Sequence, residues 1–316
     1  MNCCPSQCVD EIKRFATGEL GFDACGVAKA AAVEAQAADR YRSWVARGHH
    51  GSMAWAARNM DVRDDPRLLL EGAQSVIMVA LNYLPSVKQP PGAARVAYYA
   101  YGRDYHRVLR SRLRRLASHV EQLTGGVTRA CVDSAPLRER YWAVQAGLGF
   151  IGLNNTLIIP GRGSFFFLGA VLATAPLPPD EPCTLTCGEC RRCVEVCPVG
   201  ALNVAGDAAD ARRCLSAMTI ENHDASLPAD IAARLDGRVA GCDECQLCCP
   251  HNARAVPTSV TDFTPRDAVM SLTRESIAAM SQQEFDDTFA GSALHRVTLA
   301  TMRRNASLTP ATQDES

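Results

Sequence analysis

The residues with the clearest chemical signature are cysteines in two runs. The first run is Cys187-x-x-Cys190-x-x-Cys193-x-x-x-Cys197, followed by Pro198. The second is Cys242-x-x-Cys245-x-x-x-Cys249, followed by Pro250, and Cys214 lies between the runs. With the first spacing, three thiolates hold one [4Fe–4S] cluster and the fourth reaches a second cluster. These eight of the fifteen cysteines therefore predict two [4Fe–4S] clusters.

The same arithmetic divides the ligands between the clusters. Each run ends in Cys-Pro, and proline turns the chain away once the ligand is placed, because it has no N–H and a fixed φ. We expect this last cysteine to bind the cluster of the other run. The cluster 1 set is then Cys187, Cys190, Cys193 and Cys249. The cluster 2 set is Cys197, Cys214, Cys242 and Cys245.

Two other uses of cysteine fit the spacing less well. Zinc ribbons also use C-x-x-C pairs, but at a longer separation and without a third cysteine in step. A disulfide framework suits a small secreted chain rather than one of 316 residues. The remaining cysteines are interpreted as buried or surface thiols, with Cys183 and Cys248 close enough to compete as ligands. They are Cys3, Cys4, Cys8, Cys25, Cys131, Cys183 and Cys248.

Composition sets the class of protein. With 316 residues and 47% hydrophobic side chains, the chain can form one large domain and a smaller one. A net charge of −1 excludes binding to nucleic acid or membrane by bulk charge, but not through a local basic face. No apolar run is long enough to span a bilayer, and the first residues have no secretory signal. We expect a monomer in the reducing cytoplasm, without a membrane partner.

The pattern of apolar residues predicts a mixed α/β (α+β) fold. We expect an amphipathic helix that runs into a strand over 9–28, helices within 35–48, 105–122 and 137–147, and strands within 75–84 and 124–133. Segments 156–160 and 164–173 read as a hairpin around the turn 161–163. The proline-rich segment 174–182 marks a domain boundary. We therefore predict an α/β domain at 1–175, a cluster domain at 176–255 and a helical tail with a polar, frayed end at 256–316.

Iron–sulfur clusters transfer single electrons, and the first domain is the expected destination of these electrons. It has no G-x-G-x-x-G after a strand and no P-loop, so binding of a nicotinamide or a nucleoside triphosphate is not supported. Its dense motifs are YGRDYH (101–106), VDSAPLRER (132–140), AGLGFIGLNN (146–155) and GSFFFLG (163–169). Further motifs are CLSAMTIE (214–221) and GCDECQLCCPHN (241–252).

In these motifs, taken in order, the chain resembles the epoxyqueuosine reductase family over about residues 10–255. These enzymes use cobalamin and [4Fe–4S] clusters for the last step of queuosine modification in tRNA. The resemblance implies a nitroreductase-like cobalamin-binding domain followed by a ferredoxin-like domain with two [4Fe–4S] clusters. Leu153 replaces a basic residue that the family usually carries, and the C-terminal helical-repeat extension of many members is absent.

The resemblance also implies residue roles. Asp133 corresponds to the family's proton donor, although an aspartate there could instead cap a helix that begins near Pro136. Each of the implied cobalamin contacts could singly be an ordinary turn or surface residue. They are Arg58, Asp133, Arg140, Gly152, Asn154, Ser216, Asp243 and Glu244.

A basic segment is the candidate tRNA surface. Residues 103–115 contain six arginines, of which several follow helical spacing opposite an apolar stripe. Such a run is often only a solvated helix face, but phosphate contact is an equal alternative. The candidates are Arg103, Arg107, Arg110 and Arg114. Nearby tyrosines at 98, 99, 101 and 105 could stack on unpaired bases or pack in the core.

The expected function is reduction of epoxyqueuosine to queuosine at the wobble position of a tRNA anticodon loop. Cob(I)alamin would be fed by the two clusters, which an external flavodoxin- or ferredoxin-type donor reduces. One alternative is a reductive dehalogenase-like enzyme that uses the same cofactors on a small molecule. The other is a ferredoxin-type electron-transfer module without cobalt.

Overall fold

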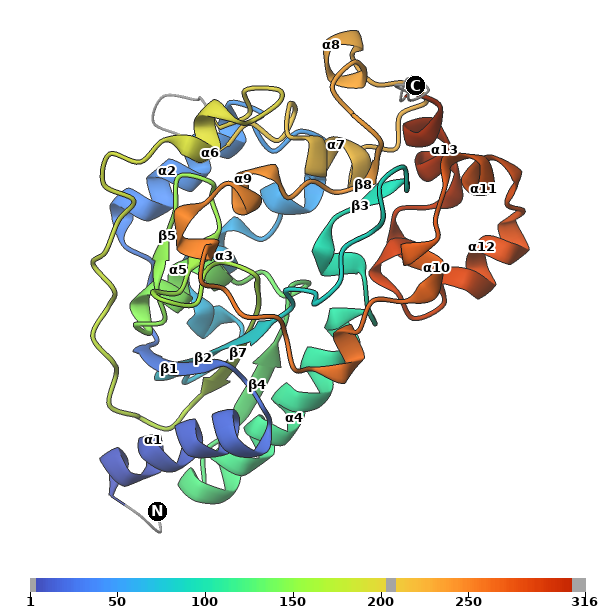
Figure 1. Cartoon of the computed structure of the whole chain (residues 1–316). Coiled ribbons are helices and arrows are strands. Elements are labelled where there is room, and N and C mark those ends of the chain that lie inside the picture. The colour runs from blue at the N-terminus through green and yellow to red at the C-terminus, as the bar shows by residue number, and fades with distance from the viewer. Residues whose placement is uncertain (1–3, 203–208, 309–316) are drawn as a thin grey trace.

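A four-stranded antiparallel sheet lies at the centre of the N-terminal half (Figure 1). The structure is a computed structural model that describes residues 4–202 and 209–308, so Cys3 and the predicted frayed end after 308 lie outside it. The strand order is β1-β2-β7-β4. The strands are β1 (Ala24–Lys29), β2 (Ser75–Asn82), β7 (Phe166–Ala173) and β4 (Thr128–Cys131).

Both faces of this sheet are covered. Along β2, Ile77, Val79 and Leu81 belong to one hydrophobic core, and the alternating residues belong to a second core. Helices α1 (Pro5–Arg14) and α4 (Tyr105–Thr124) lie on the first face, and α2 (Ala35–Ala46) and α5 (Glu139–Gln145) contribute to the core on the second. The strand predicted within 75–84 and the helix predicted at 35–48 are confirmed.

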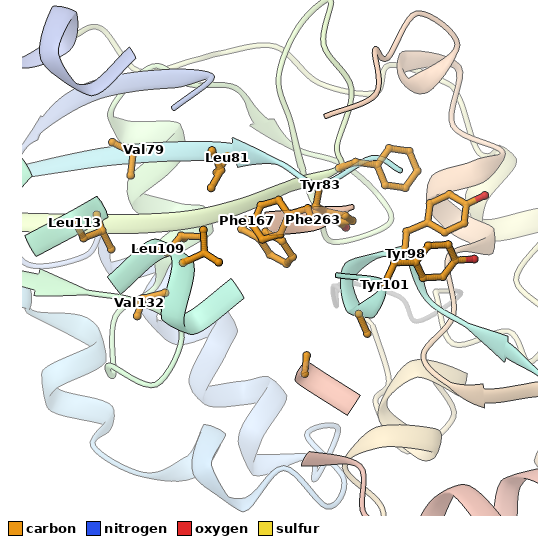
Figure 2. Close-up of a cluster of buried hydrophobic side chains, with 14 of the residues drawn as sticks. Val79, Leu81, Tyr83, Tyr98, Tyr101, Leu109, Leu113, Val132, Phe167 and Phe263 are labelled. Carbon is orange, nitrogen blue, oxygen red and sulfur yellow. The ribbon is translucent and has the colours of Figure 1, made fainter. Parts of the chain in front are cut away.

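Helix α4 positions several candidate residues. It begins at the N-cap Asp104, whose side chain accepts a hydrogen bond from the His106 N–H, and ends at Gly125 with φ 70°. Its buried stripe includes Leu109 and Leu113, which pack beside Val132 and Phe167 (Figure 2). A Cβ at Gly169 of β7 would come within 2.8 Å of the Leu113 side chain, so glycine permits this close approach.

The predicted hairpin of segments 156–160 and 164–173 is wrong. The turn at 161–163 forms, with a bridge between Ile159 and Gly163, but the strands around it have other partners. Strand β6 (Leu157–Ile158) pairs with β5 (Phe150–Ile151), whereas β7 pairs with β2 and β4. The physical reason is that the apolar β7 fills the position between two other strands of the sheet.

The cysteine-rich segment folds above the sheet in Figure 1. A small core holds Leu215, Ile231 and Leu235, and Cys197, Cys214 and Cys242 pack against it. The two-stranded parallel pairing of β3 with β8 connects this segment to the N-terminal half. The elements are β3 (Arg95–Val96), α6 (Arg192–Glu195), α7 (Leu215–Ile220), α8 (Ala229–Ala232), β8 (Arg238–Ala240) and α9 (Glu244–Leu247).

The C-terminal helices complete the first core. Phe285, Phe289 and Met302 are buried in the same cluster as Ile77 and Leu109. The helices are α10 (Asp267–Met270), α11 (Arg274–Ala279), α12 (Gln282–Phe289) and α13 (Leu299–Ser307). The helical character predicted for this region is therefore confirmed, while the domain limits at 175 and 255 stay a prediction.

In the part of the chain that the structure describes, no helix is long and apolar enough to cross a membrane.

Short helical turns connect the longer helices and the strands. The turns are α3 (Met60–Asp64), the π-helix η1 (Phe15–Glu19), and the 3-10 helices η2 (Ala54–Ala57), η3 (Pro66–Leu68), η4 (Tyr98–Ala100), η5 (Pro250–Asn252), η6 (Thr261–Phe263) and η7 (Ala293–Arg296).

Candidate active site

The four thiols of the cluster 1 set line one cavity. This small cavity is bordered by Cys187, Cys190, Cys193 and Cys249. The competitor Cys248 is not among its lining residues, although its thiol is close enough to interact electrostatically with Cys190 and Cys249. The structure thus brings the predicted set together around a space, as a cluster requires.

The thiols of the cluster 2 set are also neighbours. Burial raises the pKa of Cys245, and the thiols of Cys214 and Cys242 add to this effect. Burial likewise raises the pKa of Cys214, with a further contribution from Cys197. Cys193 of the cluster 1 set also acts on Cys245, so the two sets are adjacent. Within residues 4–202 and 209–308, no three Cys, His, Asp or Glu side chains converge on a position for one metal ion.

Backbone N–H groups point at two of these sulfur atoms. The N–H of Leu153 donates to Sγ of Cys187 at 3.4 Å, and that of Ala201 donates to Sγ of Cys197 at 3.3 Å. Hydrogen bonds to ligand sulfurs tune the reduction potential of an iron–sulfur cluster. Because the Leu153 contact is made by the backbone, it does not depend on the basic side chain that this chain lacks.

Asp133 lies at the end of β4 and faces α4. Its backbone has φ 41°, a left-handed conformation that is uncommon for a residue with a side chain. Its Oδ2 is 2.8 Å from Nε2 of His106. The alternative in which Asp133 caps the next helix is wrong, because α5 begins at Glu139 with Arg138 as N-cap and without a side-chain cap.

The contacts within the protein favour the charged form of Asp133. Burial acts to raise its pKa, but the hydrogen bond and charge of His106, with smaller effects of Tyr105 and Arg296, outweigh burial and lower the pKa. His106 shows the complementary shift: burial acts to lower its pKa, but the bonds to Asp104 and Asp133 raise it. The contacts that the protein itself provides therefore hold Asp133 as a carboxylate.

Glu139 is a second unusual carboxyl at this site. Burial and then the charge of Asp133 raise the pKa of Glu139 to about 8. Its neighbour Arg140 is exposed and donates to the backbone carbonyl of Asn155, which ties α5 to the turn after β5.

The implied cobalamin residues fall into two groups. The exposed guanidinium of Arg58 has no hydrogen-bond or ion-pair partner among the described residues, although its backbone carbonyl accepts from Arg63, and Ser216 is half-buried on α7. By contrast, the Asn154 amide is buried and donates to the Cys245 carbonyl at 3.2 Å. Glu244 accepts from Arg95 at 2.6 Å and from Arg238. The second pair has partners within the protein and braces the site.

Tyr99 connects the candidate residues in space. Burial raises its pKa first, followed by the charges of Asp243, Glu221 and Asp133. These three carboxylates come from three separate segments and act on one ring. Asp243, between two cluster 2 cysteines, also accepts a hydrogen bond from the Tyr98 N–H at 2.8 Å, and burial raises its pKa to about 6. Asp133 and the cluster 2 set therefore border one region.

Sequence reasoning assigned no role to Arg296. This exposed residue ends η7, and its charge acts on Asp133, His106 and Asp104. Two residues later, Thr298 has φ 69°, a rare conformation for a β-branched residue. No local pattern marks Arg296, because only the packing of the C-terminal helices brings it to Asp133. His106, by contrast, could have been found from the sequence, because it lies in the motif Asp104-Tyr105-His106 at the start of a helix.

The arginines of the basic segment differ in their surroundings. Arg103 forms an ion pair with Asp262 at 3.0 Å. The exposed guanidinium groups at positions 107, 110 and 114 of α4 have no hydrogen-bond or ion-pair partner within the described ranges. The tyrosines are accounted for by packing: Tyr98 and Tyr101 are buried, and Tyr105 stacks on Phe167 at 4.2 Å.

Comparisons with known proteins agree with this arrangement. Residues 63–134 match the family model described as "Epoxyqueuosine reductase QueG, DUF1730", and residues 186–252 match "4Fe-4S double cluster binding domain". The epoxyqueuosine reductase of Gloeobacter violaceus is 43% identical over 293 residues, 91% of each chain. That of Salmonella typhimurium is 39% identical over 299 residues, 92% of this chain and 77% of the relative.

Solved structures extend the likeness to the fold. A crystal structure of epoxyqueuosine reductase with a tRNA-TYR epoxyqueuosine-modified tRNA stem loop matches with a TM-score of 0.88 and 28% identity, over 96% of this chain and 80% of that chain. The enzyme from Streptococcus thermophilus matches with a TM-score of 0.85 and 29% identity, over 94% and 79%. The double-cluster match confirms two [4Fe–4S] clusters over zinc. From its sequence and its fold together, the chain belongs to the epoxyqueuosine reductase family.

Proposed function

We propose that the chain reduces epoxyqueuosine to queuosine at the wobble position of a tRNA anticodon loop. The balanced reaction takes epoxyqueuosine, two electrons and two protons to queuosine and water. The observation that carries the proposal is that the Asp133 carboxyl and Asp243, between two cluster 2 cysteines, both act on Tyr99. A proton-carrying group and the end of an electron path therefore border one place.

Cobalamin would occupy that place. When bound, it supplies the low-valent cobalt that attacks the epoxide carbon, while the protein supplies binding, orientation and protons. The exposed Arg58 and the Ser216 hydroxyl fit the amide-rimmed edge of a corrin. At Gly152 a Cβ would meet the side chains of Ile158 at 2.6 Å and Asn154 at 2.8 Å, so this glycine permits the close packing of the turn that carries Asn154. Asn154 and Glu244, which have protein partners, would hold the surrounding loops. Asp133 would donate a proton to the epoxide oxygen as that oxygen leaves carbon.

The clusters define the direction of electron flow. Two exposed residues, Leu153 and Arg192, line the cluster 1 cavity, so an external flavodoxin- or ferredoxin-type donor would reduce this cluster first. The proximity of Cys193 to Cys245 supports transfer to cluster 2, which lies toward Tyr99. We propose that a single chain contains the whole path and acts as a monomer in the cytoplasm.

The exposed face of α4 would hold the tRNA backbone. Arg107, Arg110 and Arg114 lie on this face without partners among the described residues, and each could neutralise one phosphate. The same helix begins at Asp104 and His106, beside Asp133. A strand bound along α4 would therefore run toward the proposed proton donor.

Metal analysis and a single-turnover assay test this function together. Anaerobically reconstituted protein should contain about eight irons, from two four-iron clusters, and one cobalt per chain. After reduction, it should convert epoxyqueuosine to queuosine in tRNA, as measured by nucleoside analysis. Cobalt binding with no reaction on tRNA would favour a small-molecule reductase. Iron without cobalt would favour the electron-transfer module.

A further inference from the structure

One buried histidine has no part in the reaction described so far. His106 lies in the first turn of α4, and its side chain is 4% exposed. Its Nδ1 is 2.6 Å from Oδ1 of Asp104, and its Nε2 is 2.8 Å from Oδ2 of Asp133. The side chains of Asp104 and Asp133 are 15% and 47% exposed. The imidazole thus links an inner carboxylate to one that solvent or a substrate can reach.

The proposed reaction needs two protons at the same oxygen. Opening of the epoxide requires the first, and the resulting hydroxyl requires the second before it leaves as water. A single carboxyl group holds only one proton, so Asp133 must be reloaded within one turnover. We propose that His106 reloads Asp133 with this second proton and that Asp104 holds the imidazole in place, an inference that rests on the proposed function.

The proton steps balance without further reactants. Asp133, which solvent can reach, brings a first proton into the step, gives it to the alkoxide oxygen and returns to the carboxylate form that its contacts within the protein favour. The Nε2–H of the His106 imidazolium then passes to Oδ2 of Asp133, and the neutral imidazole keeps the Nδ1–H that it donates to Asp104. Asp133 gives this second proton to the hydroxyl, which leaves as water. The two electrons come from the clusters, and His106 takes a new proton from solvent through Asp133 after product release.

The surrounding groups favour His106 over Tyr105 as the source. The two rings stack with centroids 3.9 Å apart, and the Tyr105 hydroxyl also interacts with Asp133. Burial, followed by the charge of Asp133, raises the pKa of Tyr105, so its hydroxyl keeps its proton. His106, with its raised pKa, is an acid that can be charged near neutral pH.

The same groups set the direction of the pH dependence. Asp104 and Asp133 favour the imidazolium, while burial and the Arg296 charge oppose it. Tyr99 and Glu139 face Asp133 from η4 and α5 and act on the other end of the relay. Because the net shift of the His106 pKa is upward, reloading should fail only as pH rises through that raised value.

His106→Gln is the direct test. The glutamine amide can still donate to Asp133 but has no acidic proton to transfer near neutral pH. In single-turnover assays with reduced holoenzyme and epoxyqueuosine-containing tRNA, its rate should fall by about one to two decades, within the range of general acid catalysis. The single-turnover rate of the variant should also lack the decline that the wild-type rate shows as pH rises. The matched control is His119→Gln, a half-buried histidine on the same helix whose ring stacks on Phe15 at 3.9 Å.

Thermal unfolding gives a readout that does not involve catalysis. A histidine with a raised folded pKa adds stability that is full below its unfolded pKa and is lost as pH rises through the folded value. The Tm difference between wild type and His106→Gln should therefore be widest at mildly acidic pH. Burial lowers the pKa of His119, so the pH trend for His119→Gln should have the opposite sign.

A second variant keeps the imidazole in place. Asp104→Asn removes one of the two carboxylates that favour the imidazolium. The decline of the single-turnover rate at rising pH should therefore begin at a lower pH than in wild type, and the loss of rate should be smaller than in His106→Gln. The relay is overturned if both variants keep the wild-type pH profile and the Tm difference for His106→Gln does not change with pH. If the wild-type protein does not reduce epoxyqueuosine at all, the proposed function fails and the relay fails with it.

Discussion

The Glu139 side chain accepts a hydrogen bond from the backbone N–H of Asp133 at 2.7 Å. The contact joins two residues that are six positions apart in the sequence, and it holds Asp133 in its left-handed conformation, with φ 41°. The carboxyl that fixes the proton donor is itself poorly solvated, and burial raises its pKa to about 8. The position of Asp133 therefore depends on a group that titrates within the working range of most enzymes.

Glu139→Gln should change the pH dependence of stability. A carboxyl with a raised folded pKa holds its proton in the folded state while the unfolded state loses it, so stability falls as pH rises from the ordinary value toward about 8. Glutamine removes this loss but keeps an oxygen that can accept from Asp133. The Tm of the variant, measured against pH, should fall less steeply than that of wild type. Parallel curves would show that Glu139 is charged in the folded protein.

Asp133→Asn should separate binding from chemistry. Asparagine keeps the shape and the hydrogen-bonding capacity of the side chain but cannot give up a proton. The variant should keep iron, cobalt and tRNA affinity while its single-turnover rate falls by about two decades or more. A rate near that of wild type with pre-reduced cofactor would remove Asp133 from the proton path.

Two variants at neighbouring positions, Cys249→Ser and Cys248→Ser, test which cysteine is a ligand of cluster 1. The thiol of Cys249 lines the cluster 1 cavity and that of Cys248 does not, so only the first variant should lose iron from cluster 1. Iron quantification and EPR spectra of the reduced proteins provide the measurement. Iron loss in Cys248→Ser with full retention in Cys249→Ser would reverse the assignment.

Charge reversal on α4 tests the tRNA surface. The triple variant Arg107→Glu, Arg110→Glu and Arg114→Glu should weaken tRNA binding and flatten the dependence of log K on log salt. Each lost phosphate contact removes about 0.7 to 0.9 units of slope. Arg103→Glu serves as the control, since that guanidinium is already paired with Asp262. An unchanged slope in the triple variant would place the tRNA elsewhere on the protein.

The sequence predicted best what depends on local spacing. The cysteine runs predict which thiols share a cluster, and the four thiols predicted for cluster 1 line one cavity. The apolar periodicity of 105–122 defines α4 to within two residues at its end. The pairing of β7 failed because strand partners are chosen between distant segments, here β2 and β4. The contact between His106 and Asp133 joins residues 27 positions apart and depends on how α4 packs beside β4.

The cobalamin contacts illustrate a second limit. Motif resemblance identifies positions but does not distinguish a side chain that faces a ligand from one that supports the loop behind it. The side chains of Asn154 and Glu244 have partners inside the protein, whereas the guanidinium of Arg58 has none among the residues described. Arg296 could not be found from sequence, because it reaches Asp133 only through the packing of η7 against the core.

The participation of the C-terminal helices in the first core has a consequence for biosynthesis. Ala306 and Met302 belong to the same buried cluster as Ile12, so the core cannot close until residues up to Ala306 have left the ribosome. The cysteines of both sets precede these helices and are synthesised earlier. Iron–sulfur assembly factors would therefore meet the thiols on a nascent chain whose central core is still incomplete.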